Sequence, residues 1–204
     1  MRRFVRTSVP AEGYEQVKKV GEKWLVHLEG TPAGEQQDTL ECYECMTDGE
    51  PDIAELTAEL QTWKAYVAER ELAVAKMVKK QELTEYDSSS AVNSFEIRRG
   101  GEKVTDYWIG RDLRTSLEGD VKAAKEVGST YDFDVRELGI TLTLDCEKFL
   151  SALEVLRRYA YTAYNVTSRH LAAIDALGTK EAVESYDFTT GYPSKLVFNL
   201  EDLI

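Results

Sequence analysis

Residues 53–77 read IAELTAELQTWKAYVAERELAVAKM, and apolar side chains recur in this stretch at alternating intervals of three and four. The positions of this seam are Ile53, Leu56, Leu60, Trp63, Val67, Arg70, Val74 and Met77. Such spacing places the side chains along one stripe of an α-helix, as in the heptads of coiled coils. Pro51 and Asp52 suit a helix start, so we expect a long helix from Asp52 to about Glu82.

The seam has two interpretations. It can pack inside its own chain, or it can pair with a second copy, because about three and a half heptads are just sufficient for a coiled coil. In a coiled coil, Arg70 would set the register or anchor a salt bridge. We therefore treat the seam as a candidate interface and the protein as a candidate homo-oligomer.

Short strands are predicted before this helix, within residues 1–50. Their expected ranges are Phe4–Val9, Gln16–Val20, Lys23–Leu28 and Leu40–Met46. Gly21 and Glu22 suit a type II′ hairpin turn with glycine first. Residues 30–34, with two glycines and a proline, predict a turn-rich loop.

A run of serines, Ser88 to Ser90, follows the helix and marks the clearest break in the chain. Beyond it we expect strands, and two helices that start near Asp112 and after the cap Asp145. The strands are Asn93–Arg99, Lys103–Ile109, Tyr131–Val135, Ile140–Leu144 and Lys195–Leu200, with a turn at 137–139. Thr167 or Ser168 can cap a further helical segment that ends near Leu177, and Thr179 can cap a last short helix.

The predicted fold class is therefore α+β. We expect an N-terminal antiparallel β-region (1–50), a long heptad-patterned helix (51–84) and an α+β domain with hairpins and a long helix (85–204).

Charge and hydropathy limit the partners. The chain of 204 residues carries a net charge of −12, which argues against a nucleic-acid partner. Apolar runs are too short for a membrane span, and the basic N-terminus lacks the apolar segment of a secretory signal. We expect a cytoplasmic protein with no membrane partner.

Catalytic and metal-binding patterns are weak. Cys42 and Cys45 are spaced as a metal or redox pair, but strand alternation points them to opposite faces. His27 is expected to be exposed on its strand, and His170 follows Ser168 at a spacing that is not catalytic by itself. Without a glycine-rich phosphate loop either, we predict no enzyme activity, no catalytic residue, no cofactor and no metal.

Tyrosines gather on the second long helix. Tyr159, Tyr161 and Tyr164 span more than one helix face, so core packing accounts for some of them. The functional alternative is an exposed tyrosine patch that contacts a partner.

Three blocks of sequence carry a family resemblance. They are Ala91-Val92-Asn93-Ser94-Phe95, Tyr164-Asn165-Val166-Thr167 and Tyr186-Asp187-Phe188-Thr189-Thr190-Gly191-Tyr192-Pro193. With these blocks, residues 85–199 resemble the phage and prophage family called domain of unknown function 4376, which occurs in tail-fibre-assembly-type proteins and has Bacteroides-type members. The family has no established catalytic residues, so the resemblance implies none here.

We accordingly expect a non-enzymatic structural or assembly accessory of a phage or prophage, which acts by protein contacts at the tail, fibre or baseplate. It would reside in the bacterial host cytoplasm or associate with the virion. The alternative is a small-molecule or carbohydrate-binding module that uses Tyr107, Trp108 and Tyr192.

Overall fold

The computed structural model describes residues 2–33, 38–135 and 139–204, and it confirms the α+β class. Contacts divide the chain into two compact units, Met1–Val74 and Ala75–Ile204. This division falls inside helix α1 (Ile53–Ser88), so one continuous helix contributes residues to both units. The boundaries expected at residues 50 and 84 stay a prediction.

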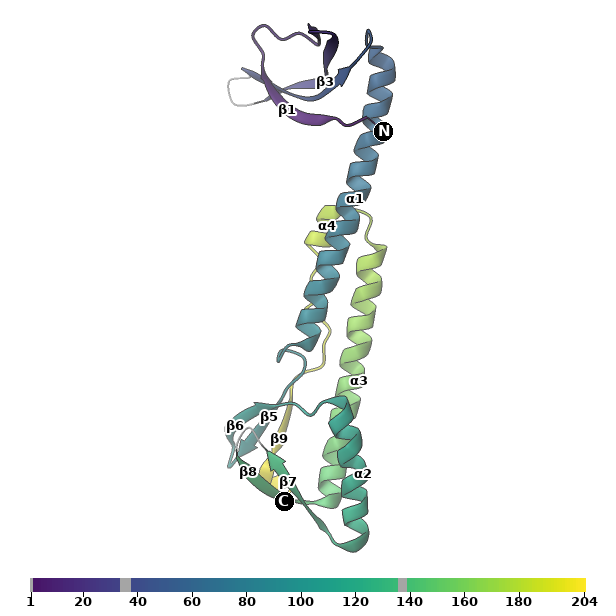
Figure 1. Cartoon of the computed structure of the whole chain (residues 1–204). Helices are drawn as coiled ribbons and strands as arrows, with labels where there is room; N and C mark the ends of the chain where they lie inside the picture. The colour runs from purple at the N-terminus through teal and green to yellow at the C-terminus, as the bar shows by residue number, and fades with distance from the viewer. Residues whose placement is uncertain (1, 34–37, 136–138) are drawn as a thin grey trace. The chain divides into compact units, whose positions relative to one another are not determined.

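The first unit contains an antiparallel sheet of the expected kind (Figure 1). Its strands are β1 (Val5–Pro10), β2 (Val17–Val20), β3 (Lys23–Ala33) and β4 (Thr39–Thr47), paired in the order β1-β4-β3-β2. Gly21 joins β2 to β3 with a φ of 67°, a conformation that a hairpin turn requires and that glycine adopts without strain.

The prediction of a loop at residues 30–34 is wrong for residues 30–33, because these residues continue β3. Gly34 lies outside the described residues. Between Leu28 and Thr31 the pairing register with β4 shifts, and Glu29 has a φ of 56°. This irregularity is a β-bulge, which bends a strand without ending it. Gly30 and Pro32 therefore lie where the strand bends and do not mark its end.

The core of the first unit lies between this sheet and the start of α1. Phe4, Val26, Leu28 and Cys45 are buried with two leucines of the helix, Leu56 and Leu60. Asp52 caps the helix, because its carboxylate accepts hydrogen bonds from the backbone N–H groups of Ala54 and Glu55 at 2.9 and 3.1 Å.

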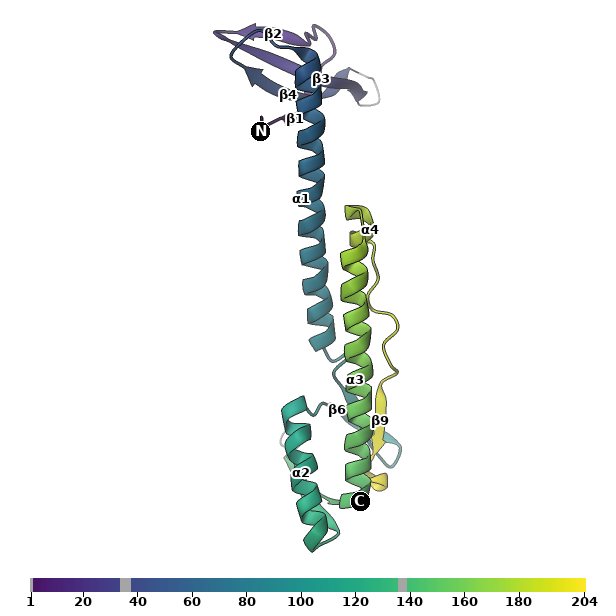
Figure 2. The same cartoon turned by 90° about the vertical axis from the view of Figure 1, so that its right-hand side faces the viewer.

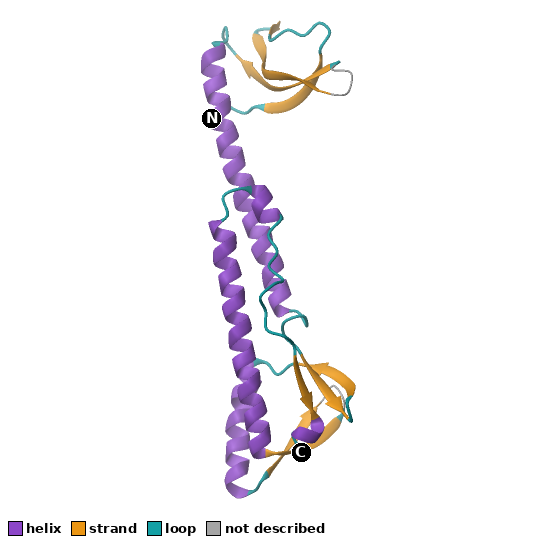
Figure 3. Cartoon of the chain, turned by 180° about the vertical axis from the view of Figure 1, so that it is seen from behind, coloured by secondary structure: helices purple, strands orange, loops and turns teal. Residues whose placement is uncertain are grey.

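The second unit joins two small sheets to helices (Figures 2 and 3). Strands β5 (Phe95–Arg99) and β6 (Glu102–Tyr107) form a hairpin, and β9 (Leu196–Asn199) pairs with β5 in parallel. Strands β7 (Thr130–Val135) and β8 (Ile140–Asp145) form the other hairpin, whose expected turn falls mostly outside the described residues. The helices are α2 (Arg111–Val127), α3 (Cys146–Ala176), α4 (Lys180–Glu184) and the short 3-10 helix η2 (Leu200–Asp202).

Helix α3 is continuous, so the expected new start at Thr167 or Ser168 is wrong. The Ser168 hydroxyl donates back along the helix to the carbonyl of Tyr164 at 2.9 Å, and the Thr167 hydroxyl lies 3.3 Å from the carbonyl of Ala163. A threonine or serine in this arrangement is compatible with a helix interior. Helix α1 is likewise longer than expected, because it reaches Ser88 and not Glu82.

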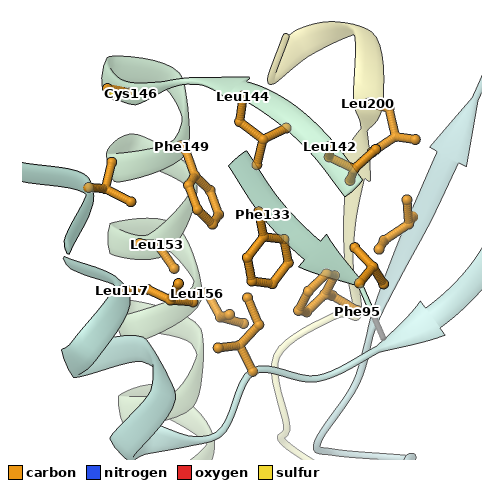
Figure 4. Packing of buried hydrophobic residues seen from close by; sticks show 14 residues of the cluster. Phe95, Leu117, Phe133, Leu142, Leu144, Cys146, Phe149, Leu153, Leu156 and Leu200 are labelled. Carbon is orange, nitrogen blue, oxygen red and sulfur yellow. The ribbon is translucent and has the colours of Figure 1, made fainter. Parts of the chain in front are cut away.

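An aromatic and aliphatic core joins the sheets of the second unit to α2 and α3 (Figure 4). Phe133 lies at its centre among side chains from β5, β8 and α3, and its ring centroid is 5.4 Å from that of Phe149. Val121 of α2 and Leu156 of α3 are almost completely buried in the same cluster. This core fixes α2 beside the N-terminal half of α3.

Candidate functional site

The first half of the predicted interface on α1 is covered by the chain itself. Leu56 and Leu60 are buried in the first core, and Ile53 and Trp63 pack against it. The Trp63 ring lies 5.9 Å from Phe4 and 6.0 Å from Tyr43, centroid to centroid. This part of the seam therefore packs inside its own chain and is not available to pair with a second copy.

The second half of the seam is more open. Val67 is half-buried and Arg70 is exposed, whereas Val74 and Met77 expose 55% and 65% of their surface. Arg70 places its guanidinium 5.9 Å from the centroid of Tyr66, one turn away. We call Val67, Arg70, Val74 and Met77 the exposed seam.

Another face of α1 is used for packing in the second unit. Leu83 is fully buried, and Lys76 donates a hydrogen bond to the backbone carbonyl of Asp175 at 2.7 Å. Lys80 forms an ion pair with the carboxylate of the same Asp175. Because six residues turn a helix by about 600°, Leu83 lies about 120° around the helix axis from Met77 and so on a different face.

The three aromatic residues predicted to bind a ligand lie in three environments. Tyr107 packs on the second core, with ring centroids 5.8 Å from Phe95 and 6.5 Å from Phe133. Trp108 lines a surface groove, whereas Tyr192 stacks on His170 at 5.9 Å. The structure does not bring the three together in one site.

The groove beside Trp108 lies between α2 and α3 and has a volume of about 750 Å³. Arg111 and Arg114 line it from α2, and Arg157, Tyr161 and Tyr164 line it from α3. Tyr161 and Tyr164 expose 67% and 66% of their surface, whereas Tyr159 is buried and donates a hydrogen bond to the carbonyl of Val92. One of the three tyrosines thus lies in the core and two lie at the surface. We call the groove lined by Trp108, the three arginines and the two exposed tyrosines the α2–α3 groove.

Two of the arginines that line the groove, Arg114 and Arg157, have partners within the chain. Arg114 donates to the carbonyl of Ile109 at 2.7 Å and lies 5.1 Å from the Trp108 ring. Burial, and secondarily the nearby charge of Arg111, lower the pKa of Arg114. Arg157 contacts the carboxylate of Glu118 at 3.5 Å and also pairs with Glu154.

A cluster of hydrogen bonds connects residues 186–193, the third block of the family resemblance, to the helices of the second unit. The hydroxyl of Thr167 donates to the Asp87 carboxylate at 2.6 Å and lies 2.8 Å from the hydroxyl of Tyr192. His170 bonds through Nδ1 to the Tyr186 hydroxyl at 2.7 Å and through Nε2 to the carbonyl of Thr190 at 2.9 Å. Both ring nitrogens of His170 are thus engaged in holding the returning segment against α3, and we call these residues the clasp.

His27 is buried, contrary to the expected exposed position. Only 8% of its surface is exposed, and its ring stacks on Tyr14 at a centroid distance of 5.8 Å. Its Nε2 lies 3.2 Å from the Glu44 carboxylate, and its Nδ1 lies 3.2 Å from the carbonyl of Glu15. The segment before β2 covers this face of the sheet, which strand alternation alone does not reveal.

The cysteines are separate thiols. Cys42, Cys45 and Cys146 are buried and unpaired, and burial raises the pKa of Cys42 and Cys45. Within residues 2–33, 38–135 and 139–204, no three histidine, cysteine or acidic side chains are placed to hold a metal ion. In the same part of the chain no helix combines the length and apolar character that a membrane span needs.

Comparison with known proteins gives no relative. No family model matches the chain, and no curated protein or solved structure matches it either. The resemblance of residues 85–199 to the phage family therefore stays a prediction.

Proposed function

We propose that this protein is a non-enzymatic structural or assembly accessory of a phage or prophage and acts by protein–protein contacts. The observation that carries the proposal is the exposed seam, where Val74 and Met77 continue a heptad pattern beyond the residues covered by the chain's own sheet. The phage context, at the tail, fibre or baseplate and in the host cytoplasm or the virion, rests on the sequence blocks of residues 85–199.

The partner that suits the exposed seam is a second copy of the chain. A two-fold pairing places the same stripe of each helix against itself, so apolar positions meet apolar positions. The seam is shorter than a full coiled coil, because its first half is already covered. We therefore expect a homodimer that dissociates on dilution.

Light scattering over a dilution series tests this proposal. Val74→Glu or Met77→Glu should weaken the dimer by roughly tenfold to a hundredfold each, because each removes one apolar side chain from the interface and introduces a charge. Arg70→Leu should strengthen it. Val127→Glu, at a position 91% exposed on α2, is the matched control and should leave the mass unchanged. A monomer at every concentration, in all these variants, would contradict self-association through α1.

The second candidate function is a small-molecule or carbohydrate-binding module. Of the three residues predicted for it, one lies in a groove. Trp108 lines the α2–α3 groove, whereas Tyr107 and Tyr192 lie elsewhere. Binding of a neutral sugar that quenches tryptophan fluorescence and is lost in Trp108→Ala would favour this alternative.

A further inference from the structure

The walls of the α2–α3 groove differ in composition from the rest of this acidic chain. Three arginines and two well-exposed tyrosines meet beside a tryptophan, in a protein whose net charge is −12. Arginine, tyrosine and tryptophan are the residues most enriched where proteins bind one another tightly. Glu118 is the acidic residue among those that line the groove.

The arginines retain capacity for an anionic partner. Arg111 forms no ion pair with any other residue in the described part of the chain, and its charge acts unfavourably on the neighbouring Arg114. Arg157 pairs with Glu118 and Glu154, but each of these carboxylates is shared with a second cation, Glu118 with Lys122 and Glu154 with Arg158. A carboxylate placed between the arginines would relieve the repulsion and could accept paired N–H donors from a guanidinium.

We propose that the α2–α3 groove binds an acidic peptide segment of a partner protein. Arg111 and Arg157, from opposite walls, contact its carboxylates, while Tyr161 and Tyr164 pack against its apolar side chains. Arg114 is already bonded to Ile109 and stacked near Trp108, so it supports the floor of the groove and adds positive charge. This inference rests on the proposed function in protein contacts, but it uses a surface separate from the exposed seam.

Size and charge favour a peptide over the alternatives. A volume of about 750 Å³ accommodates several side chains and exceeds what a single small anion needs. Single-stranded nucleic acid also uses arginine and aromatic side chains, but it requires a positive surface that continues along the strand. Among the residues that line the groove, the basic ones are three arginines beside Glu118, which suits a few carboxylates of a short segment better than a continuous phosphate backbone.

Fluorescence anisotropy of the full chain tests the proposal with three labelled probes. They are a peptide of alternating glutamate and phenylalanine, the same peptide with glutamine for glutamate, and a single-stranded thymidine oligonucleotide. We expect the glutamate peptide to bind, and its affinity to fall as salt is raised. Arg111→Gln and Arg157→Gln should each weaken it roughly tenfold, since each removes a charge-assisted contact.

The matched control is Arg169→Gln. Arg169 is an exposed residue of α3 that does not line the groove, so its replacement removes the same charge without changing the site. Tyr161→Ala should weaken both peptides, whereas the arginine variants should affect the glutamate peptide alone.

Several results would overturn the inference. They are equal binding of the glutamine peptide, binding of the oligonucleotide in place of the peptide, equal effects of Arg111→Gln and Arg169→Gln, and no binding of any probe. Light scattering on the same samples reports self-association independently, so a failure of the groove and a failure of the seam are distinguishable.

Discussion

At the scale of single residues, the clasp shows how one hydroxyl joins three segments of the second unit. Thr167 on α3 donates to Asp87 at the end of α1, and the hydroxyl of Tyr192 is placed to donate to Thr167. Burial raises the pKa of Tyr192. The Tyr192 hydroxyl acts as the donor because the Thr167 proton is directed to the Asp87 carboxylate. The carboxylate and the phenol would lose a shared partner if the hydroxyl were removed.

We predict that Thr167→Val lowers the free energy of unfolding by about 1–3 kcal/mol, because it leaves partly buried polar groups unsatisfied. Denaturant titration at neutral pH measures the effect. Thr162→Val is the control: Thr162 is exposed on the same helix and donates to the carbonyl of Arg158, so a change within about 0.5 kcal/mol is expected. An equal loss of unfolding free energy in both variants would show that the hydrogen bonds of the clasp do not stabilise the second unit.

At the scale of elements, the junction of β8 and α3 depends on one side chain. The carboxylate of Asp145 accepts hydrogen bonds from the backbone N–H groups of Glu147 and Lys148, both at 2.9 Å. These groups have no partner inside the helix, so the cap satisfies them and fixes where α3 begins. The start of α2 differs, because its cap residue Gly110 has no side chain to accept such bonds.

We predict that Asp145→Ala destabilises the second unit by about 1 kcal/mol, whereas Asp145→Asn retains most of the stability because its amide oxygen still caps the helix. Thermal unfolding followed by circular dichroism distinguishes the two variants. An alanine variant as stable as the asparagine variant would mean that packing alone sets the start of α3.

At the scale of the whole molecule, two hydrophobic cores that share no residue suggest two cooperative units. Leu60 is fully buried in the first core and Leu156 is 1% exposed in the second. The helix α1 contributes to both units, so it is the element through which they could be coupled. Large-to-small changes in each core therefore test whether the units unfold separately.

We predict two transitions in calorimetry, each shifted by one substitution. Leu60→Ala should lower the stability of one transition and Leu156→Ala that of the other, by about 2–5 kcal/mol in each case. The two variants are controls for each other, since each leaves the opposite core intact. A single transition that both variants lower equally would show that α1 couples the units into one cooperative structure.

Local chemistry determined most of the elements. Strand alternation, helical spacing and caps predicted α2, both hairpins of the second unit and the caps Asp145 and Thr179, and the structure confirms them. These features depend on neighbours within a few residues, which a sequence displays directly. The α+β class follows from the same local signals.

Tertiary structure alone decided which side chains are covered. His27 is buried by contacts with Tyr14 and Glu44 from other segments, and Thr167 bonds to Asp87 at a separation of 80 residues, whereas Val74 and Met77 stay exposed. The groove follows the same rule: Arg157, Tyr161 and Tyr164 share one face of α3 by their spacing, but only the packing of α2 on α3 brings them to Trp108, Arg111 and Arg114. Burial and charge pairing are properties of the folded chain, because they arise when remote segments remove one another from water.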